Sequence, residues 1–174
     1  MTAAGHILIV GNPNGGKTSL FNLLTGSSQR VGNYSGVTVE RSTGECESPD
    51  GTLLLSDLPG IYSLGSRSPE ERVARHEILS RKPGEIILQV ADASALDRHL
   101  HLTQQLLEMR LPVVLALNMI DVAEKRGLEI DAGELSKQLG GVPVVKISAL
   151  TGQGVDVLLR TLDEAMRRPP VCRP

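Results

Sequence analysis

The sequence predicts an α/β domain with a mostly parallel, six-stranded sheet and helices on both of its faces. Strand-like apolar runs alternate with stretches of helical periodicity along the chain, which is typical of parallel sheets whose strands are joined by helices. A glycine-rich loop also joins the first strand directly to the first helix. We expect strands at 6–11, 37–46, 52–57, 85–91, 112–118 and 142–147, and helices at 17–25, 70–81, 96–109, 131–139 and 153–167.

The composition suits one domain and argues against a nucleic-acid partner. The 174 residues are 40% hydrophobic but only 2% aromatic, so the core must be built from Leu, Val, Ile and Ala. Lys and Arg number 18 against 20 Asp and Glu, a formal charge of -2 that lacks the excess of basic residues typical of nucleic-acid binders. We expect the domain to span 1–168, with a linker or tail at 169–174 that begins at two prolines.

Cysteine usage and hydropathy also indicate the type of protein. Cys46 and Cys172 lie far apart without metal-ligand spacing, so we expect a reducing compartment and no structural role for either thiol. No apolar run approaches the ~20 residues that cross a bilayer. Residues 1–5 lead into the first strand without a signal peptide, and we therefore expect this segment to be soluble.

Residues 11–18 read GNPNGGKT and match G-x-x-x-x-G-K-[ST], the phosphate-binding loop. Its glycines let backbone N–H groups point at phosphate oxygens, and the start of the following helix adds partial positive charge. Lys17 is expected along the β and γ phosphates, with the Thr18 hydroxyl on Mg²⁺. The alternative is a glycine-rich turn without a ligand, which the strand-loop-helix context disfavours. The residues expected at the nucleotide are Gly11, Asn12, Pro13, Asn14, Gly15, Gly16, Lys17, Thr18 and Ser19.

Residues 29–40 are expected to form a loop of adjustable shape, because Gly32 and Gly36 interrupt any periodicity. Thr38 stands at its exit into a strand. Its hydroxyl would complete the Mg²⁺ shell while its N–H meets the γ-phosphate, with Gly36 and Val37 beside the nucleotide. The loop would then order around a triphosphate and relax after hydrolysis. The alternative is an ordinary loop threonine before a strand.

Asp57 ends a buried strand and begins the sequence DLPG. At the carboxyl end of a strand beside the phosphate loop, this carboxylate is placed to hold Mg²⁺ through a water. Leu58 and Pro59 lead to Gly60, whose N–H can approach the γ-phosphate. Ile61 follows and cannot form a hydrogen bond through its side chain, so any hydrolysis must position its water in another way.

A second mobile segment, 61–72, leads into the next helix. Ser68 is expected as its N-cap and Pro69 as its first residue, while Glu70 and Glu71 complement the positive end of the helix.

Residues 118–121 read NMID at the end of another buried strand. The Asp121 carboxylate can accept two hydrogen bonds from guanine, whereas adenine offers neither donor in that geometry. Asn118 is expected to brace this segment against the phosphate loop, with Met119 beside the base. The alternative is a helix-capping turn. After the last strand, the backbone N–H groups of a short turn are expected to point at guanine O6, namely Ser148, Ala149 and Leu150.

The four histidines show no metal-binding pattern. His99 and His101 face different ways on one helix and are expected to be exposed, while His6 and His76 have no companions that suggest chemistry.

The five elements GNPNGGKT, Thr38, DLPG, NMID and SAL, in this order, resemble the signature set of a translation-factor-class (TRAFAC) GTPase with a Ras-like fold. More closely, the chain resembles the cytosolic G domain of the ferrous iron transport protein B (FeoB) family. The matching stretches are GNPNGGKTSLFN at 11–22, VGNYSGVTVE at 31–40, DLPGIYSL at 57–64, SPEE at 68–71 and NMID at 118–121.

This resemblance implies a GTPase attached to a polytopic inner-membrane protein that moves Fe²⁺. Its partners would be guanine nucleotide and the permease portion of the same polypeptide, at the cytoplasmic face of the bacterial inner membrane, with self-association left open. It also implies slow, potassium-stimulated hydrolysis, in which Asn14 and the backbone carbonyls of Gly32 and Tyr34 hold K⁺. Asn14 has an alternative role as a turn residue that tolerates left-handed backbone. The residues implied in catalysis are Asn14, Lys17, Thr38 and Gly60.

The chain departs from the family pattern at two places. Gly15 stands where Ser, Cys or Ala is usual, which predicts a looser phosphate loop. Tyr34-Ser35 replaces the usual Trp-Pro, which predicts a less rigid loop at 29–40. The family normally continues into a small helical domain, and the sequence leaves open whether one follows Pro174.

Two other functions stay open from the residues alone. A ribosome-assembly or tRNA-modification GTPase shares the G-x-P-N-x-G-K loop, although the acidic pI of about 6.1 and the VGNYSGVTVE stretch argue against it. The second is a sensor that binds GTP and hardly hydrolyses it.

Overall fold

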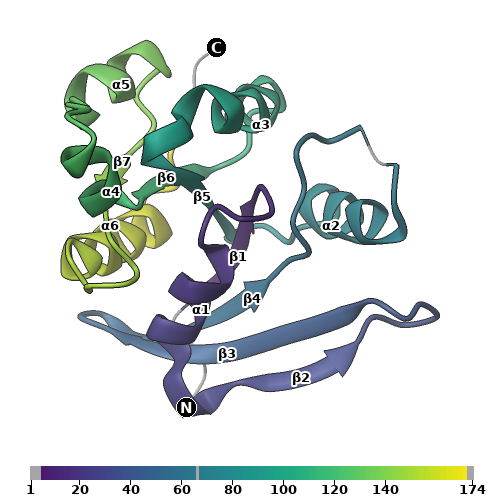
Figure 1. Ribbon diagram of the computed structural model, residues 1–174. Coiled ribbons are helices and arrows are strands. Elements are labelled where there is room, and N and C mark those ends of the chain that lie inside the picture. The colour runs from purple at the N-terminus through teal and green to yellow at the C-terminus, as the bar shows by residue number, and fades with distance from the viewer. Residues whose placement is uncertain (1–4, 66, 172–174) are drawn as a thin grey trace.

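A seven-stranded sheet forms the centre of the protein (Figure 1). The computed structural model describes residues 5–65 and 67–171. The strands lie in the order β2-β3-β4-β1-β5-β6-β7, and the pairings from β4 to β7 are parallel, whereas β2-β3 and β3-β4 are antiparallel. The strands are β1 Gly5–Gly11, β2 Arg30–Asn33, β3 Glu40–Ser48, β4 Gly51–Asp57, β5 Ile86–Asp92, β6 Val113–Asn118 and β7 Val144–Lys146.

Helices cover the sheet on both sides. They are α1 Lys17–Thr25, α2 Pro69–Leu79, α3 Leu96–Glu108, α4 Ile120–Lys125, α5 Ala132–Gln138 and α6 Val155–Arg167, with short 3₁₀ helices η1 Gly26–Ser28 and η2 Ala93–Ala95. This arrangement confirms the predicted α/β fold and all five predicted helices. Half of the predicted tail, 172–174, which includes Cys172, lies outside the described residues.

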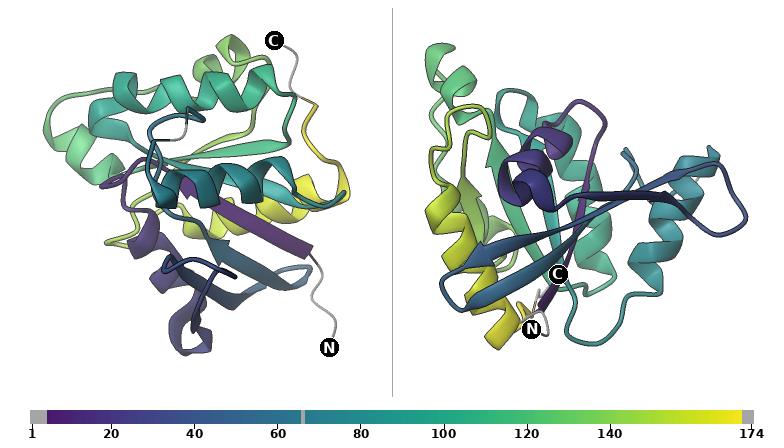
Figure 2. Two further views of the ribbon diagram at one scale, coloured as in Figure 1. Left: turned by 90° about the vertical axis from the view of Figure 1, so that its right-hand side faces the viewer. Right: turned by 90° about the horizontal axis from the view of Figure 1, so that it is seen from below.

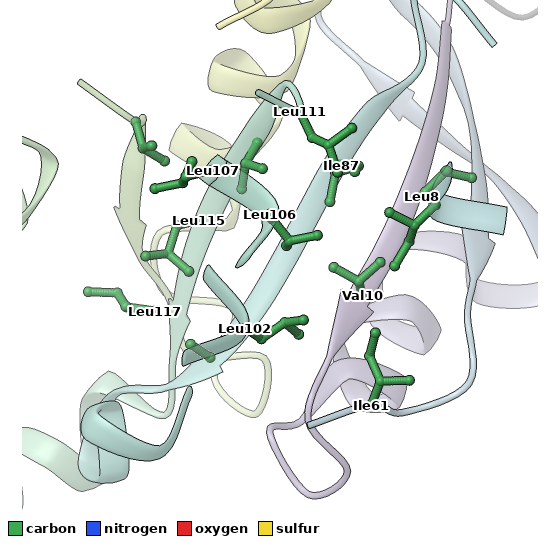
Figure 3. Close-up of a cluster of buried hydrophobic side chains, with 14 of the residues drawn as sticks. Leu8, Val10, Ile61, Ile87, Leu102, Leu106, Leu107, Leu111, Leu115 and Leu117 are labelled. Atoms are coloured by element: carbon green, nitrogen blue, oxygen red, sulfur yellow. The ribbon is translucent and has the colours of Figure 1, made fainter. Parts of the chain in front are cut away.

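The sheet buries a separate hydrophobic core on each face, because successive side chains of a strand point to opposite sides. On β1, Leu8 and Val10 pack with residues of α2 and α3, a cluster shown in Figure 3. Ile7 and Ile9 point the other way and pack with residues of α1 and α6. Figure 2 shows α6 and α2 on opposite sides of the sheet.

Two elements were not predicted. Strand β2 makes the sheet seven-stranded rather than six-stranded, and each of its four residues is exposed, so it has no apolar pattern. It forms because its backbone pairs with β3, an interaction that the sequence does not encode locally. Helix α4 begins directly after Met119, within the segment that we interpreted as a base-binding loop, and its apolar spacing is limited to Ile120 and Ala123.

The start of α2 confirms the predicted cap. The Ser68 hydroxyl accepts a hydrogen bond from the Glu71 N–H at 3.1 Å, and the Glu71 carboxylate accepts one from the Ser68 N–H at 3.1 Å. Together with Pro69 at the first position, this capping box fixes where the helix begins.

His6 links β4 to Glu85, the residue that precedes β5, on either side of β1. Its Nδ1 lies 2.6 Å from Glu85 Oε1 and its Nε2 lies 2.8 Å from Ser56 Oγ. The ring therefore satisfies two largely buried polar groups near the start of β1.

Asp163 ties helix α6 to the turn between β3 and β4. The buried carboxylate accepts hydrogen bonds from Ser48 Oγ at 2.6 Å and from the Asp50 N–H at 3.1 Å. One turn later, Arg167 pairs with the Asp50 carboxylate at 3.2 Å. The end of α6 is thus fixed to the hairpin that carries β3.

We expect Asp163→Ala to lower the free energy of unfolding by about 1–3 kcal/mol, because the Asp50 N–H loses its acceptor and the half-buried Ser48 hydroxyl keeps only the Gly51 carbonyl. Urea denaturation followed by circular dichroism measures this change. Asp156→Ala on the same helix is the control, since its side chain is 76% exposed and its ion pair with Arg160 contributes little. Equal losses in the two variants would contradict the role assigned to Asp163.

Candidate functional site

The phosphate loop occupies the turn between β1 and α1, at the carboxyl edge of the sheet. Asn14 and Gly16 both have left-handed backbone, with φ of 71° and 82°, and the Gly15 N–H donates to the Asn12 carbonyl at 3.2 Å. A Cβ on Gly16 would lie 2.1 Å from Asn118 Nδ2, so only glycine fits there. Asn14 is thus a left-handed turn residue, as the alternative interpretation expected, and it also lines the pocket described next.

A pocket of ≈ 590 Å³ lies over this loop. It brings together the phosphate loop, the DLPG segment and the NMID segment, which are far apart in sequence. Parallel strands end at the same edge of a sheet, and the register pairs Ile9 with Asp57 and Asp92 with Asn118, which aligns these ends. The lining residues are Asn12, Pro13, Asn14, Gly16, Lys17, Thr18, Ser19, Gly60 and Met119.

Lys17 and Asp57 form a largely buried ion pair beside the pocket. Lys17 Nζ donates to Asp57 Oδ1, and the two side chains are only 8% and 10% exposed. Burial raises the pKa of Asp57 above its ordinary value, and the ammonium of Lys17 and a hydrogen bond from Thr18 act in the opposite direction. The site therefore holds one positive and one negative group close together, next to a hydroxyl oxygen.

The DLPG segment continues along β1 after β4 ends. The Leu58 N–H donates to the Ile9 carbonyl at 3.0 Å and the Ile61 N–H to the Gly11 carbonyl at 2.9 Å. A Cβ on Gly60 would lie 2.9 Å from the Pro13 ring, so glycine lets this segment approach the phosphate loop. The Ile61 side chain is fully buried in the α2/α3 core (Figure 3) and does not line the pocket.

Asn118 connects the phosphate loop to the turn at 148–150. Its Nδ2 donates to the Gly15 carbonyl at 3.1 Å, and its Oδ1 accepts from the Ala149 N–H at 2.9 Å. The bracing contact expected of Asn118 is therefore present. Ser148 is buried, and the exposed Leu150 follows at the tip of the turn.

Asp121 lies in the first turn of α4 and is half-buried. Met119, at the N-cap of this helix, has left-handed backbone with φ of 61° and lines the pocket. The sharp turn at Met119 separates the end of β6 from α4 and places Asp121 just beyond the carboxyl edge of the sheet.

The residues of 32–38 that were expected at the nucleotide, Mg²⁺ or K⁺ do not line this pocket. They lie at the far end of the β2-β3 hairpin, which runs along the edge of the domain and ends beside α2 (Figures 1 and 2). Hydrogen bonds close the tip, from the Tyr34 N–H to the Val39 carbonyl at 3.0 Å and from the Val37 N–H to the Tyr34 carbonyl at 3.3 Å. Thr38 is exposed there, and Tyr34, Ser35 and Val37 instead line a hollow of ≈ 380 Å³ against α2.

The prediction that His99 is exposed was wrong. His99 is only 6% exposed, whereas His101 is exposed as expected. Burial lowers the pKa of His99 below its ordinary value, which disfavours the charged form of its ring. The signal was available in the helical spacing, because His99 lies on the same stripe as the buried residues Leu102, Thr103 and Leu106.

The described residues contain no group of three or more His, Cys, Asp and Glu side chains that could hold a metal ion. Nor does any helix among residues 5–65 and 67–171 combine the length and apolar character that crossing a bilayer requires.

The family model described as "Ferrous iron transport protein B" matches residues 5–162. The chain belongs to this family. It is 47% identical over 159 residues to the Fe(2+) transporter FeoB of Escherichia coli (strain K12), which covers 89% of the chain but only 20% of the relative. The chain therefore spans about one fifth of the length of the curated FeoB proteins that it matches. This membership separates it from the ribosome-assembly and tRNA-modification GTPases.

Solved FeoB structures have the same fold. A variant of S. thermophilus NFeoB bound to GDP is 52% identical, with a TM-score of 0.83 over 90% of the chain and 60% of its own length. The G domain of T. maritima FeoB is 42% identical, with a TM-score of 0.85 over 92% of the chain and 97% of its own length. The FeoB chain thus has the Ras-like fold of the phosphate-loop GTPases.

Replacing Asn118 tests the connection that it makes. We expect Asn118→Ala to lower the free energy of unfolding by about 1–3 kcal/mol, because the Gly15 carbonyl and the Ala149 N–H both lose a buried partner. Chemical denaturation without added nucleotide measures the change. Asn22→Ala, at an exposed position on α1, should change stability by less than about 0.5 kcal/mol, and a similar effect of both variants would show that the connection contributes nothing.

Proposed function

We propose that this chain is the guanine-nucleotide-binding and GTP-hydrolysing domain of a protein that takes up ferrous iron through an attached inner-membrane transporter. The observation that carries this proposal is the meeting of the phosphate loop, DLPG and NMID at one pocket, with Asn118 joining the pocket to the turn at 148–150. The GDP-bound FeoB relatives and the transporter name of the curated relatives support it. The domain would act at the cytoplasmic face of the membrane.

The phosphates would bind to the backbone N–H groups of 14–18 and to the Lys17 ammonium. The start of α1 contributes partial positive charge at the same place. In the structure the ammonium pairs with Asp57, so binding would transfer Lys17 from the carboxylate to the phosphate oxygens.

Magnesium fits the oxygen atoms beside the phosphate loop. The Thr18 hydroxyl and the Asp57 carboxylate are hard oxygen donors next to each other, the ligand type that Mg²⁺ prefers. Mg²⁺ bound there would offset the negative charge of the β and γ phosphates. Thr38 would join these residues only if the 29–40 segment leaves its position beside α2, and this movement would make the segment a nucleotide-dependent switch.

The base would bind at the opposite end of the pocket, between the NMID segment and the turn at 148–150. Asp121 would accept hydrogen bonds from the N1–H and exocyclic amine of guanine, while the N–H groups of the turn point at O6. Asn118 would hold the two sides of this site at a fixed distance through its two hydrogen bonds.

Hydrolysis would use a monovalent cation rather than a side chain after Gly60. Ile61 is fully buried and has no polar side-chain atom, so it cannot orient a water. Asn14 is exposed at the pocket, where its side chain would help to hold K⁺ near the phosphates. The carbonyls of Gly32 and Tyr34 would join it after the same movement that brings Thr38 to the site.

Nucleotide preference tests the proposed function. We expect calorimetry with Mg²⁺ to show GDP and GTP binding at least about hundredfold tighter than ATP, because adenine would leave the Asp121 carboxylate unpaired. Asp121→Asn should weaken GDP and strengthen xanthosine diphosphate, which serves as the internal control for an intact phosphate site. Equal affinity of the unmutated chain for ATP and GTP would refute guanine recognition.

Potassium dependence tests the proposed mechanism. GTP hydrolysis should be faster in KCl than in NaCl at equal ionic strength, and Asn14→Ala should abolish this difference while GDP affinity falls by less than about fivefold. Phosphate release under single-turnover conditions gives the rate. If the two salts give the same rate in the unmutated chain, the cation mechanism does not operate here.

A further inference from the structure

The underside of the phosphate loop rests on a histidine of helix α3. Gly15 has no positive φ, in contrast to Asn14 and Gly16 on either side of it, so its backbone conformation would accept a side chain. The space beside it is tight instead, so a side chain there would require its neighbours to shift by a few tenths of an ångström. A Cβ on Gly15 would lie 3.2 Å from His99 Cε1, 3.3 Å from the Val90 carbonyl oxygen and 3.4 Å from the Asn12 carbonyl oxygen. The imidazole therefore occupies the volume into which a side chain at position 15 would extend.

Hydrogen bonds hold the backbone around His99 in place from two directions. Gln89 Nε2, from the centre of the sheet, donates to the His99 carbonyl at 3.2 Å. Asn12 Nδ2, from the phosphate loop itself, donates to the Arg98 carbonyl at 3.3 Å. The backbone at the first turn of α3 is thus fixed both to β5 and to the loop, which holds the Cα of His99 beneath Gly15.

The contact between the phosphate loop, β5 and the first turn of α3 is made by buried polar side chains. Gln89 is fully buried and Asn12 and His99 are 3% and 6% exposed, yet Asn12 Oδ1, Gln89 Oε1 and His99 Nδ1 have no hydrogen-bond partner among the residues that the structure describes. Buried polar atoms without partners cost free energy, and apolar side chains of similar size would avoid that cost. Residues retained at such a cost are expected to serve the site that they contact rather than the stability of the fold.

We propose that His99 is a positioning residue for the nucleotide, and that Gly15 and His99 form a matched pair. The phosphate groups would bind on the side of the loop that faces the pocket. The His99 ring supports the opposite side, next to Gly15, so the ring sets the direction of the N–H groups at 14–16. This inference rests on the proposed function. If it holds, Gly15 need not loosen the loop as the sequence predicted, because the His99 ring lies in the space beside this glycine.

A double-mutant cycle at the two positions tests the pair, using the whole 174-residue chain. Gly15→Ala should weaken the binding of a fluorescent GDP analogue by about fivefold or more, because its methyl group collides with the ring and tilts the loop. His99→Ala should also weaken binding, because it leaves a cavity into which the loop sinks. In the double variant, the methyl group enters the vacated space, so adding Gly15→Ala to His99→Ala should change affinity by less than about twofold.

The rate of analogue release should follow the same pattern, since a misdirected loop affects release more than association. His101→Ala, at an exposed position on the same helix, is the matched control and should leave both quantities unchanged. Circular dichroism and urea denaturation check that each variant is folded. If His99→Ala does not fold, His99→Asn replaces it in the cycle with the same expectation.

The possible outcomes separate this inference from the proposed function. Rescue in the double variant supports the pair. Additive losses, or a Gly15→Ala variant that binds GDP normally, overturn the pair while leaving guanine nucleotide binding intact. If the unmutated chain binds no GDP in the presence of Mg²⁺, the proposed function fails and this inference fails with it.

Discussion

The candidate site depends on two hydrogen bonds made by one buried side chain. Asn118 donates to the Gly15 carbonyl and accepts from the Ala149 N–H, so it joins the first loop of the fold to the last one. Both partners lie at the carboxyl edge of the sheet, where the parallel register of β1, β5, β6 and β7 brings them together. An amide is suited to this position because it offers a donor and an acceptor at once. Because Asn118 is the last residue of β6, the distance between the phosphate loop and the 148–150 turn is set by a strand of the sheet rather than by the loops themselves.

Much of this arrangement was predictable because its signals are local. The phosphate loop, the cap at Ser68 and the strand that ends at Asp57 each need only a few neighbouring residues to specify them, and their order fixed the topology. Other features depend on partners far away in sequence. The exposed strand β2 exists through its pairing with β3, and the burial of His99 follows from the packing of α3 under the loop. The motif at 31–40 likewise indicated a chemistry for Thr38 without indicating where the segment lies.

The hairpin that carries Thr38 is weakly attached to the rest of the domain. Every residue of β2 is exposed, and the 34–39 tip is closed by two backbone hydrogen bonds of its own and rests against α2. Segments with few buried apolar contacts move at little free-energy cost. The other end of β3 is fixed, because Asp163 and Arg167 of α6 hold the β3-β4 turn. A movement of the tip would therefore bend the hairpin about its anchored half and leave the sheet unchanged.

The ion pair of Lys17 and Asp57 beside the pocket holds one group that would bind phosphate and one that would bind its metal ion. Lys17 and Asp57 neutralise each other in a largely buried place, and removing either partner would leave an uncompensated charge there. Phosphate alone would take the ammonium away from Asp57 and leave a largely buried carboxylate, whose pKa is raised by burial, without its cation. A divalent cation that arrived alone at Asp57 would be repelled by the positive charge of the Lys17 ammonium. In the proposed function, a phosphate and a cation that arrive together would give both side chains a partner, so the pair would favour the metal-bound nucleotide over either component by itself.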